Sequence, residues 1–300
     1  MTKGIILFPK STQSAKSNAF GWWLSEAYAA GMFVKIDFFE DFNPESFDKP
    51  DFVVMRGYNR DISLTFESTG TPVINTWTAM ASSRDKLLAY ECLIRAGIPT
   101  PESISSTQCT TFNDATSLFG PKFVVKQTDG SQGVNVFLVD SEDTFREALA
   151  KCGGTALLQR YVATSHGRDI RVWTIGEKAV AAVLRQSDTK FVSNYSQGGK
   201  ASLFPMNADV ASTAVKAARA LGLDFAGVDI LFDGNGYTVC EVNGNAGFRT
   251  LSAVSDINII KHLYEYIHER TLFLDHFAVN AYAFAEIDKM WRRVQPRAVA

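Results

Sequence analysis

The sequence predicts a protein of the α/β and α+β classes, and three observations support this. Strand and helix signals alternate over residues 1–82, which is typical of a mainly parallel sheet covered by helices. From Phe123 onward the pattern changes to strands that pair with their sequence neighbours. The chain has 300 residues, of which 46% are hydrophobic and 21% charged, so it is long enough for about two globular domains.

Charge and hydropathy exclude several classes of partner. The formal net charge is -2, so bulk electrostatics attract neither nucleic acid nor an anionic membrane, and we expect neither partner. No uncharged run of about 18 apolar residues occurs, and the apolar run at Gly4–Phe8 is too short for a secretion signal. The four cysteines are scattered without metal-ligand spacing. Reduced core thiols in a cytoplasmic protein are therefore expected.

Residues 1–82 are predicted to form an N-terminal α/β domain. Its predicted elements are strands at Gly4–Phe8, Phe33–Phe39, Asp51–Met55 and Thr71–Asn75, with a helix at Asn18–Ala30. The segment Arg56–Arg60 follows the carboxyl end of a strand, where open α/β sheets bind ligands. It either contacts a carboxylate substrate or forms a solvated loop.

Residues 83–158 carry a helix and then a hairpin. The helix is predicted from Ser83 to Gly97, because an apolar stripe ends at a glycine and prolines follow. The hairpin pairs Phe123–Lys126 with Asn135–Val139 around a polar turn that contains glycines. A short helix and a further strand are predicted at Asp143–Ala150 and Thr155–Tyr161.

Residues 159–300 combine several strands with one strong helix, Ala208–Leu221. The strands are predicted at Ile170–Thr174, Ala179–Arg185, Val228–Phe232 and Tyr237–Asn243. The polar stretch Ser187–Ser202 has few apolar anchors, so we expect a loop that becomes ordered over a bound ligand. Helical patterns recur at Ile257–Arg270 and Ala278–Arg293, and the part after Thr271 is either an extra helix or a dimer contact.

Two apolar strands around residue 235 carry the sharpest chemical signal. Asp229 lies in the first strand, and Glu241 and Asn243 lie in the second. A three-residue loop at Gly234–Gly236 would place Asp229 opposite Glu241, on the face that also carries Asn243. Two carboxylates and an amide oxygen are ligands that suit Mg²⁺. The alternative is an exposed polar face with unrelated acids.

Two further polar segments are candidates for nucleotide binding. Lys126 ends a strand before the glycine-containing loop Gln127–Gly133, and an ammonium group with backbone N–H groups can bind phosphate. The strand end at Gln159–Val162 can offer backbone groups to a purine edge, with Asp169 reaching a ribose hydroxyl. The alternatives are an ordinary hairpin tip and an ordinary strand beside a surface ion pair.

In this order and spacing, the segments resemble the ATP-grasp superfamily, and specifically its RimK-type glutamate ligases. The resemblance runs from about Ser83 to Glu269 and rests on residues 84–86, 96–99, 124–126, 130–133, 169–171, 193–194, 198–199, 217–219, 226–231 and 241–243. It implies an N-terminal pre-ATP-grasp α/β domain at 1–82 and a two-subdomain ATP-grasp fold. The small lid subdomain would span 83–158, and the C-terminal subdomain with an extra helix would span 159–300.

The resemblance also implies roles for individual residues. Lys86 and Lys126 would bind phosphate, and the hinge residues Gln159, Arg160, Tyr161 and Val162 would bind adenine. Asp169 would contact the ribose, and Asn194 would also belong to the nucleotide site. Magnesium ligands are implied at Asp229, Glu241 and Asn243. Catalytic contacts to developing phosphoryl charge are implied at Arg171, Arg185 and Asn243. The implied cofactors are ATP and two Mg²⁺ ions, with Mn²⁺ as a substitute.

Three departures from the RimK pattern concern the nucleotide and acceptor side. Val192 stands where the family has an arginine, and Arg160 replaces an acidic hinge residue. The proline usual after Asn243 is missing, because the chain continues Gly244-Asn245-Ala246-Gly247. Nucleotide binding is therefore a firmer expectation than glutamate as the substrate.

The function implied is an ATP-dependent carboxylate–amine ligase that works through an acyl phosphate. It would add an amino acid to a peptide, protein or metabolite, using small-molecule or peptide substrates, either as a monomer or as a homo-oligomer. One alternative is a tailoring enzyme that closes amide or ester links on a precursor peptide. Another is a non-catalytic ATP-binding module, against which the complete set of polar residues argues.

Overall fold

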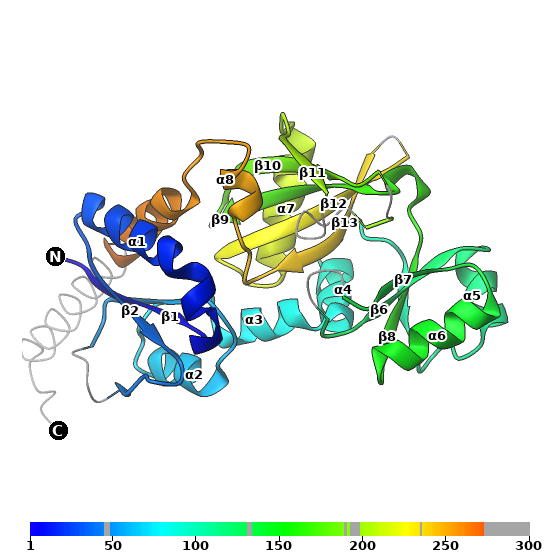
Figure 1. Cartoon of the computed structure of the whole chain (residues 1–300), viewed down its shortest axis with the longest axis horizontal. Coiled ribbons are helices and arrows are strands. Elements are labelled where there is room, and N and C mark those ends of the chain that lie inside the picture. The colour runs from blue at the N-terminus through cyan, green and yellow to red at the C-terminus, as the bar shows by residue number, and fades with distance from the viewer. Residues whose placement is uncertain (45–48, 131–133, 189–190, 193–198, 235, 273–300) are drawn as a thin grey trace, which may run out of the picture.

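The computed structural model describes residues 1–300 except 45–48, 131–133, 189–190, 193–198, 235 and 273–300. Within these residues the chain forms three sheets, each built from one part of the sequence (Figure 1). The α/β and α+β classes are confirmed. The second and third sheets meet at the pocket described below.

The first sheet is parallel and has the order β2-β1-β3-β4. Its strands are β1 (Lys3–Phe8), β2 (Phe33–Phe38), β3 (Phe52–Met55) and β4 (Val73–Ile74). Successive side chains of β1 point to opposite faces. Ile6 and Phe8 pack in a cluster with Trp23, which belongs to α1 (Gln13–Ala29). Ile5 and Leu7 pack in another with Phe66 of α2 (Arg60–Ser68), so the two helices cover opposite faces.

The second sheet is antiparallel and has the order β5-β8-β6-β7. Its strands are β5 (Ser103–Ser105), β6 (Phe123–Gln127), β7 (Val136–Val139) and β8 (Ala156–Arg160). Two helices, α5 (Phe112–Phe119) and α6 (Glu142–Cys152), accompany it. The aromatic rings of Phe112, Phe123 and Phe145 pack against one another in its core. The predicted hairpin of β6 and β7 is confirmed.

The third sheet is antiparallel and has the order β11-β10-β9-β12-β13. Its strands are β9 (Arg168–Ile175), β10 (Lys178–Gln186), β11 (Lys200–Leu203), β12 (Phe225–Asp233) and β13 (Gly236–Asn243). The helix α7 (Ala208–Ala220) packs Ala214 and Ala218 against one face. On the other face Trp173 and Phe225 share a core cluster with Trp23 of α1. The N-terminal region and the third sheet therefore have a continuous core.

Shorter elements complete the described chain. They are 3-10 helices at Lys10–Thr12 and Ala163–Ser165, the helices α3 (Trp77–Arg84), α4 (Lys86–Arg95) and α8 (Arg249–Ser252), and a helix at residues 259–272. The helix predicted to begin near Ser83 is wrong in its start. It begins at Lys86, because the Asp85 carboxylate caps it by accepting from the N–H groups of Leu87 and Leu88.

One prediction about a polar segment changes, and several others are not tested. The stretch Ser187–Ser202 was expected to be a loop throughout, but Lys200–Leu203 forms β11 and pairs with β10. Much of the rest of this stretch lies outside the described residues, so its closure over a ligand stays a prediction. The helix expected at Ala278–Arg293 also lies outside them. The predicted domain limits at 82/83 and 158/159 fall within α3 and β8, and they stay a prediction.

Candidate active site

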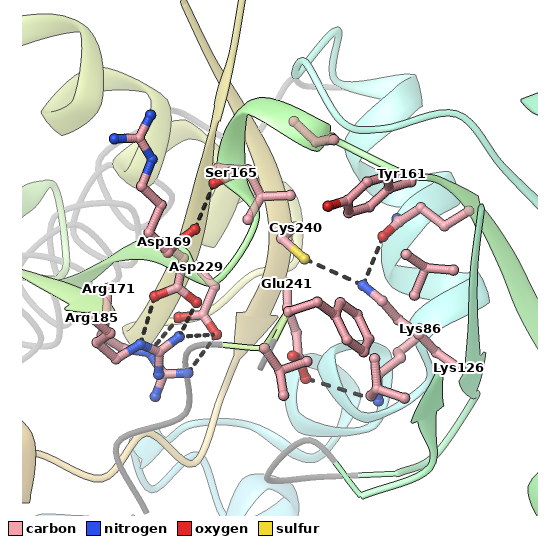
Figure 2. A pocket seen from close by; sticks show the side chains of 18 of the residues that line it. Lys86, Lys126, Tyr161, Ser165, Asp169, Arg171, Arg185, Asp229, Cys240 and Glu241 are labelled. Carbon is pink, nitrogen blue, oxygen red and sulfur yellow. Dashed lines mark hydrogen bonds and ion pairs between the residues drawn. The ribbon is translucent and has the colours of Figure 1, made fainter. Parts of the chain in front are cut away.

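A pocket lies between the second and third sheets and brings together the residues that the sequence singled out (Figure 2). It is lined by Lys86, Lys126, Gln159, Arg160, Tyr161, Val162, Asp169, Arg171, Arg185, Asp229, Glu241 and Asn243. Of the predicted site residues only Asn194 is not placed here, because it lies outside the described residues. Residues separated by more than a hundred positions thus line one pocket.

The floor of the pocket is the hairpin of β12 and β13, where Asp229 pairs with Glu241 as predicted. The expected three-residue loop is wrong, because Gly236 already pairs with Asp233. The shorter connection would shift the register by one residue. A β-bulge at Cys240 corrects this shift, since Ile230 pairs with Val239 and Asp229 with Glu241. The side chains of Asp229 and Glu241 therefore both reach the pocket.

Asp229 is the centre of a buried ion-pair network. Both of its carboxylate oxygens accept from Arg171, one from Nε and the other from Nη2 at 2.6 Å. Nη2 of Arg185 lies 3.1 Å from the same carboxylate. Arg185 also donates to Asp169 from Nε at 2.7 Å and from Nη2 at 2.6 Å. The network follows from strand register, because Asp229 pairs with Arg171 and Asp169 pairs with Arg185.

The network controls the ionisation of its members. Burial disfavours the charged form of Asp229, but the guanidinium groups of Arg171 and Arg185 outweigh it and lower the pKa of that carboxyl group. Burial likewise opposes the charge on Arg185, yet Asp229 and Asp169 raise its pKa. Asp229 and Arg185 are therefore both charged at neutral pH. Asp169, predicted to contact ribose, is engaged with Arg185 in this structure.

The hairpin offers oxygen ligands that fit Mg²⁺. No three His, Cys, Asp or Glu side chains gather into a metal-holding group anywhere in the described chain. Two carboxylates and the Asn243 amide are nevertheless a donor set that Mg²⁺ completes with water and phosphate oxygens. The hydrogen-bond network favours Asn243 with its oxygen toward Nη2 of Arg171 (3.2 Å) and its amide nitrogen toward Glu241 (3.3 Å). Asp229 would exchange an arginine contact for the metal.

Two lysines line the opposite side of the pocket. Lys126 donates from Nζ to Oε1 of Gln159 at 2.7 Å and to Sγ of Cys240 at 3.3 Å, and it is 7% exposed. Lys86 donates to the carbonyl of Gly130, and its Nζ lies 3.9 Å from Oε1 of Glu241. Both ammonium groups therefore face the hairpin of β12 and β13, which forms the floor of the pocket.

Residues Gln159–Val162, at the end of β8 and just after it, line the pocket. Gln159 is fixed by Lys126 and by a bond from its Nε2 to Oγ of Ser103 at 2.9 Å. Arg160 pairs with Asp233, so this departure from the family pattern points its charge at the hairpin end. Tyr161 bonds through its hydroxyl to Nδ1 of His166. Contact of this segment with a purine edge stays a prediction.

Sequence reasoning missed the apolar part of the pocket and one thiol. Val124, Val136, Phe191, Val192 and Leu231 line it together with Cys240. The alternation of β6, β7 and β12 could have identified the strand residues, whereas Cys240 reaches the pocket through the bulge. Burial raises the pKa of the Cys240 thiol, although the ammonium of Lys126 opposes this.

Comparison with solved structures defines the class of protein. The D-alanine–D-alanine ligase from Bacillus anthracis superposes with a TM-score of 0.71 at 19% identity, covering 91% of this chain and 98% of that one. The ATP-grasp ligase PsnB bound to a minimal precursor gives 0.70 at 18%, covering 90% and 99%. A RimK domain ATP-grasp protein from Sphaerobacter thermophilus gives 0.68 at 19%, covering 88% and 99%. The fold is that of the ATP-grasp ligases.

Sequence comparison then gives the family. The model of the RimK-like ATP-grasp domain matches residues 83–267. A probable alpha-L-glutamate ligase from Shewanella loihica is 33% identical over 218 residues, which is 71% of this chain and 72% of the relative. One from Legionella pneumophila is 34% identical over the same shares. The chain belongs to the RimK-like ATP-grasp family, and it is an ATP-dependent carboxylate–amine ligase that forms C–N bonds.

The same comparisons bear on cofactors and partners. ATP and Mg²⁺ are the cofactors of this family, and one PsnB structure contains Mg and ADP. No helix in the described part of the chain is long and apolar enough to cross a membrane.

Proposed function

We propose that this chain adds a free amino acid, with L-glutamate as the first candidate, to the carboxylate of a peptide, protein or small metabolite. The relatives named probable alpha-L-glutamate ligases support the amino acid. The observation that carries the proposal is the arrangement of the pocket. Two lysines face Asp229, Glu241 and Asn243 across it, with Arg171 and Arg185 beside the carboxylates. This arrangement suits phosphoryl transfer, where positioning and charge neutralisation supply most of the catalysis.

The reaction needs no nucleophile from the protein. A substrate carboxylate oxygen attacks the γ-phosphorus of ATP, the bond to the β-phosphate oxygen breaks, and ADP leaves. The amine nitrogen then attacks the carbonyl carbon of the acyl phosphate, phosphate leaves, and a proton is released. In this scheme Lys86 and Lys126 hold phosphate oxygens, while Arg171 and Arg185 stabilise charge on the transferred group.

Metal binding has a defined place in this proposal. Asp229, Glu241 and Asn243 would hold Mg²⁺, which supplies positive charge beside the phosphates. Two ions, and replacement by Mn²⁺, stay predictions. So do the roles of Gln159, Arg160, Tyr161, Val162, Asp169 and Asn194 at the nucleotide, the cytoplasmic location and a homo-oligomer.

A screen with hydroxylamine tests the function. Hydroxylamine replaces the amine and traps an acyl phosphate as a hydroxamate, so each carboxylate can be tested without knowing its partner. We expect ADP release and hydroxamate formation that depend on one class of carboxylate, including amino acids and short peptides with a free carboxyl end. ATP binding without carboxylate-dependent ADP release would instead indicate a non-catalytic module. A product in which two parts of one precursor peptide are linked would favour the tailoring alternative.

A further inference from the structure

Arg56 is a buried cation at the seam between the N-terminal sheet and the third sheet. It follows β3 directly, and its backbone N–H donates to the carbonyl of Leu7 at 2.8 Å. Its side chain is folded inward, so the residue is only 5% exposed. The guanidinium donates from Nη2 to the carbonyl of Ala246 at 2.8 Å and lies over the rings of Trp23 and Phe225. All of these partners are neutral.

Arg56 has no acidic partner, and this distinguishes it from three other arginines that are partly or fully buried. Arg171 and Arg185 pair with Asp229, and Arg270 pairs with Asp224. No carboxylate among the described residues forms an ion pair with Arg56. Desolvation by burial lowers its pKa to about 10, as expected for a cation with no anion beside it. A buried charge without a counterion is costly, and a carboxylate from a ligand would remove that cost.

Asn245 supplies an independent observation at the same seam. Its Nδ2 donates to the backbone carbonyl of Arg56 at 3.4 Å. Its Oδ1 is fully buried and has no hydrogen-bond partner, a condition shared in the described chain only with Thr174 Oγ1. A buried acceptor without a donor calls for an N–H or O–H group from elsewhere. At the seam, the Arg56 guanidinium has no anion and the Asn245 oxygen has no donor. An α-amino acid carries both missing groups, a carboxylate and an amine.

The seam also lies next to the pocket. Asn245 is two residues after Asn243, and Ala246 packs so closely on β12 that a Cβ at Gly227 would come within 2.9 Å of its own. The same Cβ would lie 3.2 Å from Cδ of Arg171. Gly227 therefore lets Ala246 and the Arg171 stem pack together. Gly247, the next residue, is exposed.

We infer that Arg56 and Asn245 form the subsite for the α-amino acid that supplies the amine. Arg56 binds the α-carboxylate, and Oδ1 of Asn245 accepts a hydrogen bond from the amine nitrogen and orients it. The carboxylate that is activated cannot be the one on Arg56, because it must face the γ-phosphate beside Arg171. This inference rests on the proposed ligase function and adds the place and the recognition of one substrate.

Binding measurements on the whole protein with Mg²⁺ and ADP test the subsite. The probes are the twenty L-amino acids and, for each that binds, its α-amide, beginning with L-glutamate and isoglutamine. Tryptophan fluorescence provides the signal, because the Arg56 guanidinium lies 5.8 Å from the Trp23 ring. We expect at least one L-amino acid to bind and its α-amide to bind about 100-fold more weakly. This comparison requires no variant, so it decides the question even if substitutions at Arg56 prevent folding.

The variants Arg56→Gln and Arg56→Lys extend the test. Arg56→Gln should weaken amino-acid binding about 100-fold and leave the weak binding of the α-amide unchanged, with Arg56→Lys between the two. Arg219→Gln is the matched control, because Arg219 is a 72% exposed arginine on α7 that pairs with Glu177. The inference is overturned if no amino acid binds, if the α-amide binds as tightly as the acid, or if a folded Arg56→Gln protein binds like the unsubstituted one.

Hydroxamate formation separates this inference from the proposed function. Hydroxylamine has no carboxylate, so its use as the amine bypasses Arg56. A folded Arg56→Gln protein should form hydroxamate at the normal rate while its KM for the amino acid rises about 100-fold. If the unsubstituted protein forms no hydroxamate with any carboxylate, the ligase function is refuted. If Arg56→Gln leaves the KM for the amino acid unchanged, only the subsite is refuted.

Discussion

Arg171 on β9 and Asp229 on β12 are direct cross-strand neighbours, and the guanidinium of the first holds both carboxylate oxygens of the second. The predicted metal ligand is therefore part of an ion pair in the protein without ligands. We expect binding of Mg²⁺ and ATP to compete with this pair and to leave Arg171 available to a phosphoryl group. A substitution in this network should therefore change both the stability of the protein and its catalytic rate.

Glu241→Gln should lower carboxylate-dependent ADP release by at least about 100-fold and leave the fold intact. Its carboxylate is 30% exposed, and its contacts are long, at 3.9 Å to Nζ of Lys86 and 3.3 Å to the Asn243 amide, so stability should change by less than about 1 kcal/mol. The loss of one charged metal ligand explains the lower rate. Steady-state rates over a range of Mg²⁺ concentrations provide the measurement. A rate near normal at ordinary Mg²⁺ would remove Glu241 from the metal site.

Asp229→Asn should reduce the rate as strongly but should also destabilise the protein. Arg171 and Arg185 would keep buried charges with one acid removed. We expect a loss of about 3 kcal/mol in the free energy of unfolding, measured by urea denaturation. A stability equal to that of Glu241→Gln would contradict the importance of the network.

The stability difference between the unsubstituted protein and Asp229→Asn should depend on pH. The pKa of Asp229 is lowered in the folded state, so its contribution is present above the unfolded pKa of about 3.9 and is lost as pH falls through the folded value. The difference should be constant between about pH 5 and 7 and shrink below about pH 4. Urea midpoints across this range give the answer, and a difference that grows on acidification would be inconsistent with the ion pairs.

Lys126→Ala should weaken ATP binding by about 10-fold or more. Its ammonium is buried against Gln159 and Cys240. Its removal leaves Oε1 of Gln159 without its donor, so we also expect a cost of about 1 kcal/mol in stability. Calorimetry with a non-hydrolysable ATP analogue measures the affinity. Lys151→Ala is a suitable control, because that lysine is exposed on α6. Unchanged affinity would exclude Lys126 from phosphate binding.

Cys240 should react slowly with iodoacetamide at pH 7 and faster as the pH rises well above 9. Burial raises the pKa of its thiol, so little thiolate is present at neutral pH. ATP with Mg²⁺ should protect it, because its side chain lines the pocket. Mass spectrometry of the peptide that contains Cys240 follows the reaction, with Cys92 as the internal reference. Equal rates with and without nucleotide would show that Cys240 is not covered by bound ATP.

Local patterns in the sequence predicted much of the fold and most of the pocket. Alternation identified β12 and β13, and a glycine at 222 in the left-handed region ends the predicted α7 helix. The helix α5 was missed although its signals were present. Thr111 caps it by accepting from the N–H of Asp114, and Gly120 ends it with a φ of 86°. The strand β11 was missed because its residues are polar and lie at a sheet edge.

Contacts between distant segments were beyond such patterns. Nothing local indicates that Asp229 will meet Arg171, because that pairing depends on the order of strands in the sheet. Asn75 is a similar case. Its side chain donates to the carbonyls of Phe225 and Gly244 and accepts from the N–H groups of Asp224 and Phe225, and so ties the end of β4 to both sides of the hairpin. Only the folded chain reveals these bonds.

Because of the bulge at Cys240, the facing of Asp229 and Glu241 depends on the number of residues between them. A strand exposes alternate residues on each face, so a single inserted or deleted residue between Asp229 and Glu241 turns one carboxylate away from the other. The short connection shifts the strand register by one residue, and the bulge shifts it back by one residue. Adding a residue to the connection while deleting Cys240 should preserve the pairing, whereas either change alone should abolish it. Length variation in this segment is therefore tolerated only as matched pairs of changes.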